Sequence, residues 1–260
     1  MRGMHRPFPD HRAHTLTALR VARLAALLSG LACSWSVAAA PQSQPVPVPV
    51  PVPDTLAQRL QACATCHGAE GRAGNSGYQP RIAGKPAGYL YNQLINFREG
   101  RRSNAAMTQL TDPLSDGYLR EIAEHYAGLN LPYPAPQKPA APAAVLERGR
   151  LLVHQGDAAR GVPACVACHG VAMTGAQPAI PGLLGLPRDY LTAQIGAWQT
   201  GLRRATAPDC MRQIAQRLGR DDTVALAAWL AAQKLPTDSH PAPASAITTP
   251  LPLDCGSGLR

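Results

Sequence analysis

The sequence predicts an all-α protein in which one small helical domain occurs twice. The same landmarks recur about a hundred residues apart, and apolar residues recur at helical spacing. No segment shows the sustained alternation of apolar and polar residues that is typical of a β-strand. A domain of this size buries little apolar surface, so it often needs a metal, a cofactor or a disulfide to complete it.

The repeat is specific in its details. The motif Cys63-x-x-Cys66-His67 corresponds to Cys165-x-x-Cys168-His169 at an offset of 102 residues. The landmarks that follow correspond at an offset of 101: Pro80 and Pro181, Gly84 and Gly185, Tyr89 and Tyr190, Gln93 and Gln194, Gly100 and Gly201. Met107 and Met211 correspond at an offset of 104. So many landmarks in the same order indicate a duplicated domain.

Composition divides the chain into six segments. They are a signal peptide (1–39), a Pro-Val-rich spacer (40–53), a first domain (54–133), a proline-rich linker (134–143), a second domain (144–236) and an irregular C-terminal tail (237–260). Helical patterns are predicted at 55–66, 89–98 and 115–128 in the first domain, and at 144–156, 190–199 and 220–234 in the second.

The first 39 residues have the features of an export signal. Five arginines precede a short apolar run at 24–33, and small residues at 36–40 suit cleavage after Ala38 or Ala39. The alternatives are an uncleaved N-terminal membrane tether and a lipid on Cys33. The apolar run is shorter than the roughly 20 residues that a membrane span needs. We therefore expect a periplasmic protein.

The paired Cys-x-x-Cys-His motifs carry the main chemical signal. In such a motif both thiols add to the vinyl groups of one haem, and the adjacent His binds its iron. Cys63 and Cys66, and likewise Cys165 and Cys168, are thus predicted attachment sites for two haem c groups, with His67 and His169 as iron ligands. A zinc ribbon needs its cysteine pairs much closer together, and a thioredoxin-like motif needs a βαβ context.

The second axial ligand decides whether each haem carries electrons or binds small molecules. Met107 and Met211 hold matching late positions in the repeat, on a predicted loop before each closing helix. Both are predicted to ligate iron, and His/Met ligation raises the reduction potential. Met173 has no counterpart in the first copy, so it is interpreted as a packing residue. The protein is accordingly expected to be an electron carrier and not an enzyme.

Charge argues against a nucleic-acid partner. The formal net charge is +9, but the leader contributes five arginines and one aspartate, which leaves +5 for residues 40–260. Four propionates from two haems would lower this to about +1. Residues 144–236 hold 10 basic and 6 acidic side chains, so an acidic face on a redox partner would suit this segment. The alternative is a scattered, solvated surface.

The chain resembles the dihaem class I cytochromes c of the cytochrome c4 type over about residues 55–236. The likeness lies in the two Cys-x-x-Cys-His-Gly motifs, the stretch PRIAGKPAGYLYNQLINFREGRR, the late Met and the closing helix LSDGYLREIAEHYAGL. It implies two tandem class I cytochrome c domains that shuttle electrons in the periplasm, in a respiratory chain that ends at a terminal oxidase. It also implies that Pro80, Pro181, Tyr89 and Tyr190 pack on the haems. It further places Tyr89 and Tyr190, together with Arg101–Arg102 or Arg203–Arg204, near the propionates or the domain interface.

Two cysteines remain after haem attachment and leader removal. Cys210 and Cys255 are expected to form a disulfide, because thiols in an oxidising compartment are usually bonded. The alternative is that Cys210, next to Met211, supplies a thiolate ligand to the second haem, as in some thiosulfate-oxidising dihaem cytochromes. A further alternative is the electron-transfer subunit of a periplasmic dehydrogenase. Redox proteins are the expected partners, with docking to a membrane complex and a monomeric or weakly oligomeric state.

Overall fold

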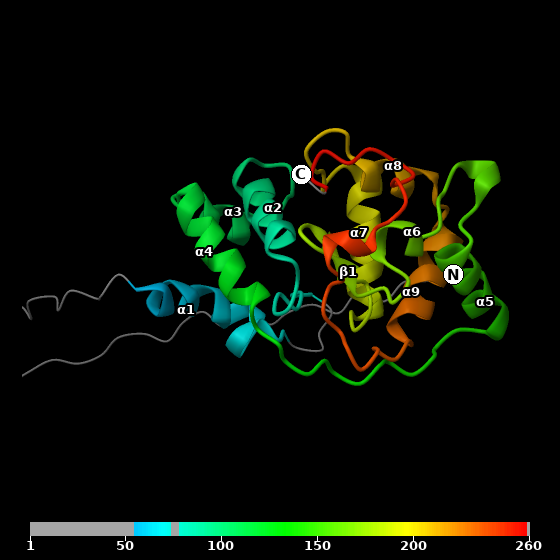
Figure 1. Cartoon of the computed structure of the whole chain (residues 1–260), viewed down its shortest axis with the longest axis horizontal. Coiled ribbons are helices and arrows are strands. Elements are labelled where there is room, and N and C mark those ends of the chain that lie inside the picture. The colour runs from blue at the N-terminus through cyan, green and yellow to red at the C-terminus, as the bar shows by residue number, and fades with distance from the viewer. Residues whose placement is uncertain (1–54, 74–77, 259–260) are drawn as a thin grey trace, which may run out of the picture. The chain divides into compact units, whose positions relative to one another are not determined.

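The computed structural model describes residues 55–73 and 78–258. The predicted leader and the whole Pro-Val spacer lie outside these ranges. Within them, the only sheet is a two-stranded one, and the remaining regular structure is helical, which confirms the predicted all-α class (Figure 1). No helix in the described part of the chain has the length and apolar character required to cross a bilayer.

The helices fall into two groups along the chain. The first lobe holds α1 (Leu56–His67), the 3₁₀ turn η1 (Ala69–Gly71), α2 (Ala87–Arg98), α3 (Ala105–Thr111) and α4 (Asp116–Ala127). The second lobe holds α5 (Ala143–His154), η2 (Ala158–Arg160), α6 (Val166–His169), α7 (Arg188–Thr200), α8 (Cys210–Arg217) and α9 (Arg220–Ala231). The antiparallel strands β1 (Gly175–Ala176) and β2 (Ile180–Pro181) lie between α6 and α7, and η3 (Ala244–Ala246) lies in the tail.

Side-chain caps set several helix starts in both lobes. Ser115 caps α4 by accepting from the Tyr118 N–H at 3.3 Å, and Asn104 caps α3 by accepting from the Met107 N–H at 3.0 Å. Asp209 caps α8 in the same way, from the Arg212 N–H at 3.0 Å. Such caps replace hydrogen bonds that the first turn of a helix cannot make internally.

The two lobes have separate apolar cores. In the first lobe, α2 packs on α4 around Leu90, Ile122 and Tyr126. In the second, α5 packs closely on α9, because Gly149 has no Cβ that would collide with the Ala225 carbonyl. Leu152 and its neighbours are fully buried there, so the second core is the more extensive one.

The structure differs from the sequence-based expectations in two local features. The predicted loops that carry Met107 and Met211 are short helices, α3 and α8, which span too few residues to show a clear apolar period. The tail, predicted as irregular, adds to the small sheet through Ala242, which forms a parallel bridge with Ala176. The Gln177 N–H donates to the Ala242 carbonyl at 2.8 Å.

Candidate haem-binding sites

The first Cys-x-x-Cys-His motif occupies the last turn of α1. Cys63 is half-buried and Cys66 is exposed, and neither forms a disulfide. His67 is buried, and its Nδ1 lies 2.9 Å from the Pro80 carbonyl oxygen. Because a carbonyl only accepts, Nδ1 carries the proton and donates it, which leaves Nε2 free to bind a metal.

The second motif repeats this arrangement. Cys165 immediately precedes the short helix α6, Cys168 lies within it, and His169 is its last residue. Both cysteines are free, half-buried thiols. His169 is buried, and its Nδ1 donates to the Pro181 carbonyl at 2.7 Å. The predicted haem-packing prolines therefore also orient the histidines through their backbone carbonyls.

Burial controls the protonation of both histidines. It lowers the pKa of His67, an effect that the Pro80 carbonyl opposes and the Arg102 charge reinforces. It likewise lowers the pKa of His169, where the Pro181 carbonyl opposes the shift and the Lys85 charge adds to it. Both imidazoles are therefore neutral at pH 7, as a metal ligand requires.

Burial also favours the protonated form of three motif thiols, Cys63, Cys165 and Cys168. It raises the pKa of Cys165 to about 11, and it raises the pKa values of Cys63 and Cys168 as well. In the case of Cys63, hydrogen bonds from the Tyr126 side chain and the backbone oppose this rise.

The two methionines lie in matching first turns. Met107 follows the Asn104 cap of α3, which packs on α2, and Met211 follows Cys210 at the start of α8, which packs on α7. Both side chains are half-buried. Met173 is buried in the core of the second lobe, which agrees with its interpretation as a packing residue.

Arg102 and Arg203 hold the two lobes together through a pseudo-symmetric contact. Their backbones form an antiparallel bridge. Arg102 donates to Gln93 at 2.9 Å and to Gln194 at 2.8 Å, and Arg203 donates to the same two glutamines at 3.0 Å and 2.8 Å. The repeat landmarks Gln93 and Gln194, to which the sequence assigned no role, thus accept from both arginines.

The predicted haem-packing tyrosines lie at this contact. The Tyr89 hydroxyl accepts from Arg203 at 3.3 Å, and the Tyr190 hydroxyl accepts from Arg102 at 3.4 Å, so each bond crosses between lobes. Burial raises the pKa of Tyr89, but the charges of Arg203 and Arg102 outweigh burial and lower it below the ordinary value. The resemblance placed the tyrosines near the propionates or the interface, and they lie at the interface.

The contact between the lobes has positive charge without matching acids. Arg203 is 4% exposed, and no carboxylate of the described residues forms an ion pair with it or with Arg102. Burial and the neighbouring Arg102 charge lower the pKa of Arg203. Arg203 also stacks on Trp198 at 3.7 Å, and the buried Nε1 of Trp198 has no hydrogen-bond partner in the described ranges. Buried cations and an orphaned donor fit anionic acceptors such as haem propionates.

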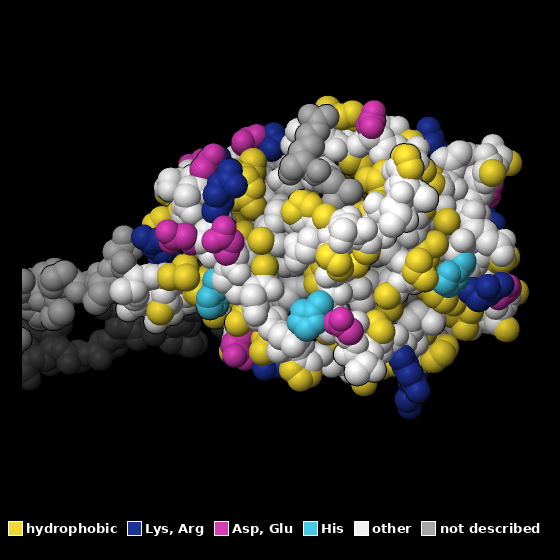
Figure 2. All heavy atoms as spheres, viewed as in Figure 1, with side chains coloured by type: hydrophobic (Ala, Val, Ile, Leu, Met, Phe, Trp, Pro, Cys, Tyr) yellow, Lys and Arg dark blue, Asp and Glu magenta, His cyan; other side chains and the backbone are white. Residues whose placement is uncertain are grey.

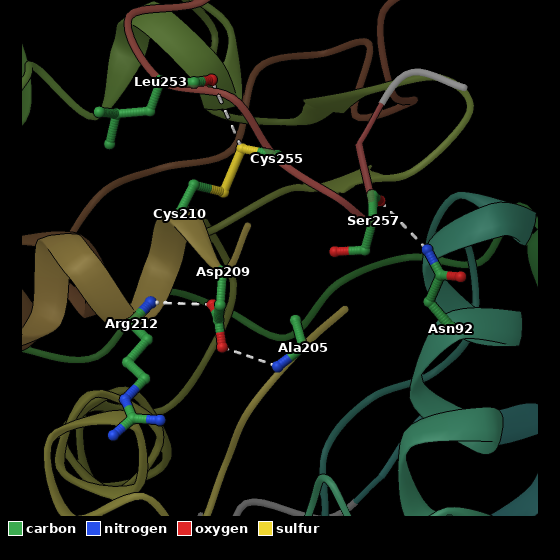
Figure 3. The surroundings of a disulfide bond; sticks show 8 residues. All are labelled: Asn92, Ala205, Asp209, Cys210, Arg212, Leu253, Cys255 and Ser257. Carbon is green, nitrogen blue, oxygen red and sulfur yellow. Dashed lines mark hydrogen bonds between the residues drawn. A yellow bond between two sulfur atoms is a disulfide. The ribbon is translucent and has the colours of Figure 1, made fainter. Parts of the chain in front are cut away.

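The start of α8 is covalently tied to the tail (Figure 3). A disulfide joins Cys210 to Cys255, 45 residues apart. Beside it, Asp209 accepts from the Ala205 N–H at 2.7 Å as well as capping α8. On the other side, the Ser257 carbonyl accepts from the Asn92 side chain of α2 at 3.1 Å, so the tail reaches the first lobe.

Comparisons with known proteins show that the chain is similar to cytochrome c4 and to electron acceptors of thiosulfate dehydrogenase. No protein-family profile matches the chain. It is 37% identical over 223 residues to a thiosulfate dehydrogenase electron acceptor of Thiomonas intermedia, covering 85% of this chain and 93% of that protein. It is 31% identical over 171 residues to a cytochrome c4 of Thiocapsa roseopersicina, covering 65% of this chain and 85% of the relative.

Two solved structures share the fold. A thiosulfate dehydrogenase of Marichromatium purpuratum is 36% identical with a TM-score of 0.59, covering 66% of this chain and 36% of that one, so the chain spans about a third of that protein. The reduced cytochrome c4 of Pseudomonas stutzeri is 26% identical with a TM-score of 0.59, covering 68% of this chain and 96% of that one.

Proposed function

The chain belongs to the cytochrome c4 family of dihaem electron carriers, and we propose that it accepts electrons from a thiosulfate dehydrogenase. Family membership means that the protein holds two covalently bound haem c groups and exchanges electrons with redox proteins. The choice of donor rests on one observation. The chain is 37% identical to a named electron acceptor of thiosulfate dehydrogenase over 93% of that protein, compared with 31% to the Thiocapsa cytochrome c4.

Within this proposal the chain's residues have defined roles. Residues 54–133 and 144–236 are the two cytochrome c domains, each attached to haem through its cysteine pair. His67 and His169 would ligate the haem irons through Nε2, and Met107 and Met211 would supply the second protein ligand of each iron. Each bound haem then contributes a one-electron change at its iron.

The protein around each haem holds it and adjusts its charge environment. The Pro80 and Pro181 carbonyls fix the orientation and tautomer of the histidines. Arg102 and Arg203, which lack carboxylate partners in the described part of the chain, supply the positive charge that haem propionates need when they leave water. No step in this role requires a substrate pocket.

Cys210 supports the carrier role over the thiosulfate-oxidising one. Its sulfur is in a disulfide with Cys255, so it offers no thiolate to iron or to a sulfur substrate. We propose a periplasmic location, with onward transfer of the electrons to a terminal oxidase.

Docking to the donor is proposed to use electrostatic attraction. Residues 144–236 carry 10 basic and 6 acidic side chains, so an acidic donor face suits this segment. Figure 2 shows charges of both signs interspersed on the face in view, so the excess of basic side chains on this face is modest. The reduction rate is therefore expected to fall moderately as salt rises.

Stopped-flow reduction of the purified holoprotein tests the donor. With thiosulfate and a thiosulfate dehydrogenase, both haems should become reduced at the turnover rate of the dehydrogenase. With thiosulfate alone, neither haem should become reduced. Reduction by thiosulfate alone would show that the chain is itself the enzyme. A dehydrogenase that leaves it oxidised, while a quinol-oxidising complex reduces it, would identify a general respiratory shuttle.

A further inference from the structure

Lys85 is a buried lysine that reaches from the first lobe into the second. It is 5% exposed, and its Nζ donates to the Gly182 carbonyl at 3.1 Å. Gly182 directly follows Pro181, whose carbonyl holds His169. The neighbouring Gly88 N–H donates to the Pro178 carbonyl at 3.0 Å, so the start of α2 is fixed against the same segment. A first-lobe cation thus lies beside the segment that orients the histidine of the other lobe.

The Lys85 charge is not neutralised by the described residues. No carboxylate among them forms an ion pair with Lys85, and the centroid of the Tyr133 ring lies 5.7 Å from its Nζ. The other two lysines of the chain, Lys138 and Lys234, are exposed. Burying an ammonium group without an acid is costly, so its charge acts strongly on whatever lies near it.

The repeat makes this charge one-sided. At the offset of 101 that relates Gly84 to Gly185, the counterpart of Lys85 is Leu186, a buried member of the second apolar core. The second lobe therefore has no corresponding lysine beside the Pro80 segment. Arg102 and Arg203, in contrast, contact both lobes through the same two glutamines. Lys85 thus adds a cation from the other lobe to the second site only, whereas the buried cation beside Pro80 in the first site is Arg81 of the same lobe.

We propose that Lys85 raises the reduction potential of the second-domain haem and so increases the fraction of reduced protein in which that haem holds the electron. This role rests on the proposed function, in which His169 ligates the iron of that haem. Gaining an electron makes a haem more negative by one charge, and a fixed cation in a poorly solvated region stabilises that reduced state. Lys85 bonds to the Gly182 carbonyl and not to His169, so it is a positioning residue that acts through the Pro181–Gly182 segment and through its charge.

Redox titration of the holoprotein, followed in the haem absorption bands, tests the proposal with three substitutions. Lys85→Gln removes the charge but keeps a donor that can reach toward Gly182, Lys85→Met removes both, and Lys85→Arg keeps the charge. Lys234→Met removes an exposed lysine from the second lobe and is the matched control. A Met211→His variant identifies the second haem, because exchanging its Met ligand for His lowers that potential selectively.

Loss of the charge should shift electrons away from the second haem. In Lys85→Gln and Lys85→Met we expect the ratio of reduced second haem to reduced first haem to fall about fivefold, which is about 41 mV at ~59 mV per tenfold change. Lys85→Arg and Lys234→Met should leave the ratio within about 1.5-fold of the unsubstituted protein, a range of about 10 mV on the same scale.

Several results would overturn the proposal. A Lys85→Gln protein with two intact haems and an unchanged ratio would show that the charge has no such effect. Equal falls in both potentials would show that the cation acts on the interface as a whole. Absence of haem from Cys165 and Cys168, measured by intact mass, would instead refute the proposed function on which the second site depends.

Discussion

The two lobes share the parts that hold a haem and differ in what surrounds those parts. Each has a Cys-x-x-Cys-His motif, a histidine fixed by a proline carbonyl, and a methionine in the first turn of a short helix. Among the described residues, the second lobe alone has a disulfide, a sheet extended by the tail, and a buried carboxylate, Asp222, that bonds two arginines. Duplication therefore preserved the haem-binding geometry, while the supporting structure diverged.

The two lobes differ most in how much of their first helix is buried. In α1 the only buried residue is His67, so this helix contributes little core of its own. In α5 the residues Gly149, Leu152 and Val153 are buried against α9. The first lobe should therefore depend on its haem for stability more than the second lobe does.

Removing each cysteine pair gives the largest expected effect. Cys63→Ser with Cys66→Ser should lose one haem and most of the helical signal of the first lobe, because α1 has little else to pack against. Cys165→Ser with Cys168→Ser should also lose one haem but retain more helix, since α5 and α9 keep their core. Intact mass reports the haems and far-ultraviolet circular dichroism reports the helix. Equal helix loss in the two variants would contradict the comparison.

Exchanging the methionines tests whether the sites are alike at the iron. Met107→Ala and Met211→Ala should each abolish the near-infrared Met–iron band of one haem. Each should also lower one potential by a sizeable part of the ~0.8 V that axial ligands span. Met173→Leu is the control, because Met173 lies in the core, and it should leave both bands unchanged. Survival of both bands in either alanine variant would remove that methionine from the ligand set.

Breaking the disulfide should affect only the second lobe. Cys210→Ser with Cys255→Ser removes a cross-link between residues 45 positions apart. Its loss should lower the free energy of unfolding by roughly 2–4 kcal/mol. Ala106 holds the matching position before Met107 and is exposed, so Ala106→Ser is the control and should change little. Thermal unfolding followed at each haem measures both. An equal loss of stability at the first haem would show that the tail supports both lobes.

Features set by residues close together in the sequence could be predicted, whereas contacts between the two lobes could not. The cysteine motifs, the repeat and the longer helices are patterns of neighbouring residues, so they could be recognised without coordinates. A count of the remaining thiols was enough to pair Cys210 with Cys255, the pair that the structure joins. Lys85 gives no such signal, because its contact with Gly182 spans 97 residues of chain.

The same limit applies to the interface arginines. The family resemblance placed Arg101–Arg102 and Arg203–Arg204 near the propionates or the interface but could not choose among them. In the structure Arg102 and Arg203 make the crossed bonds to the glutamines and tyrosines, whereas Arg204 crosses only to backbone carbonyls of Gly100 and Arg101. Trp198 is a further case, because its unpaired Nε1 becomes informative only once its burial is known.

The smallest expected difference between the lobes is in how much stability each loses in acid. Asp222, near the start of α9, accepts from Arg148 at 3.0 Å and from Arg160 at 2.6 Å. Burial alone would raise the pKa of Asp222, but Arg160, the Gly219 N–H and Arg148 outweigh burial and hold it below the ordinary value. The stabilisation is therefore fully present above the unfolded-state pKa of about 3.9, and it is lost as pH falls through the lower folded-state value.

Substitution of Asp222 gives the matching measurement. Asp222→Asn should lower the stability of the second lobe at pH 7 by about 2 kcal/mol, because two arginines lose a charged acceptor. It should also flatten the fall in stability of that lobe below pH 4. The control is Asp116→Asn in the first lobe, where the carboxylate bonds Arg98 at 2.6 Å but its side chain is 62% exposed, so solvent screens the pair. Unfolding followed at each haem as a function of pH distinguishes the two substitutions. An equal response to both would show that the bonds of Asp222 to Arg148 and Arg160 give the second lobe no added stability.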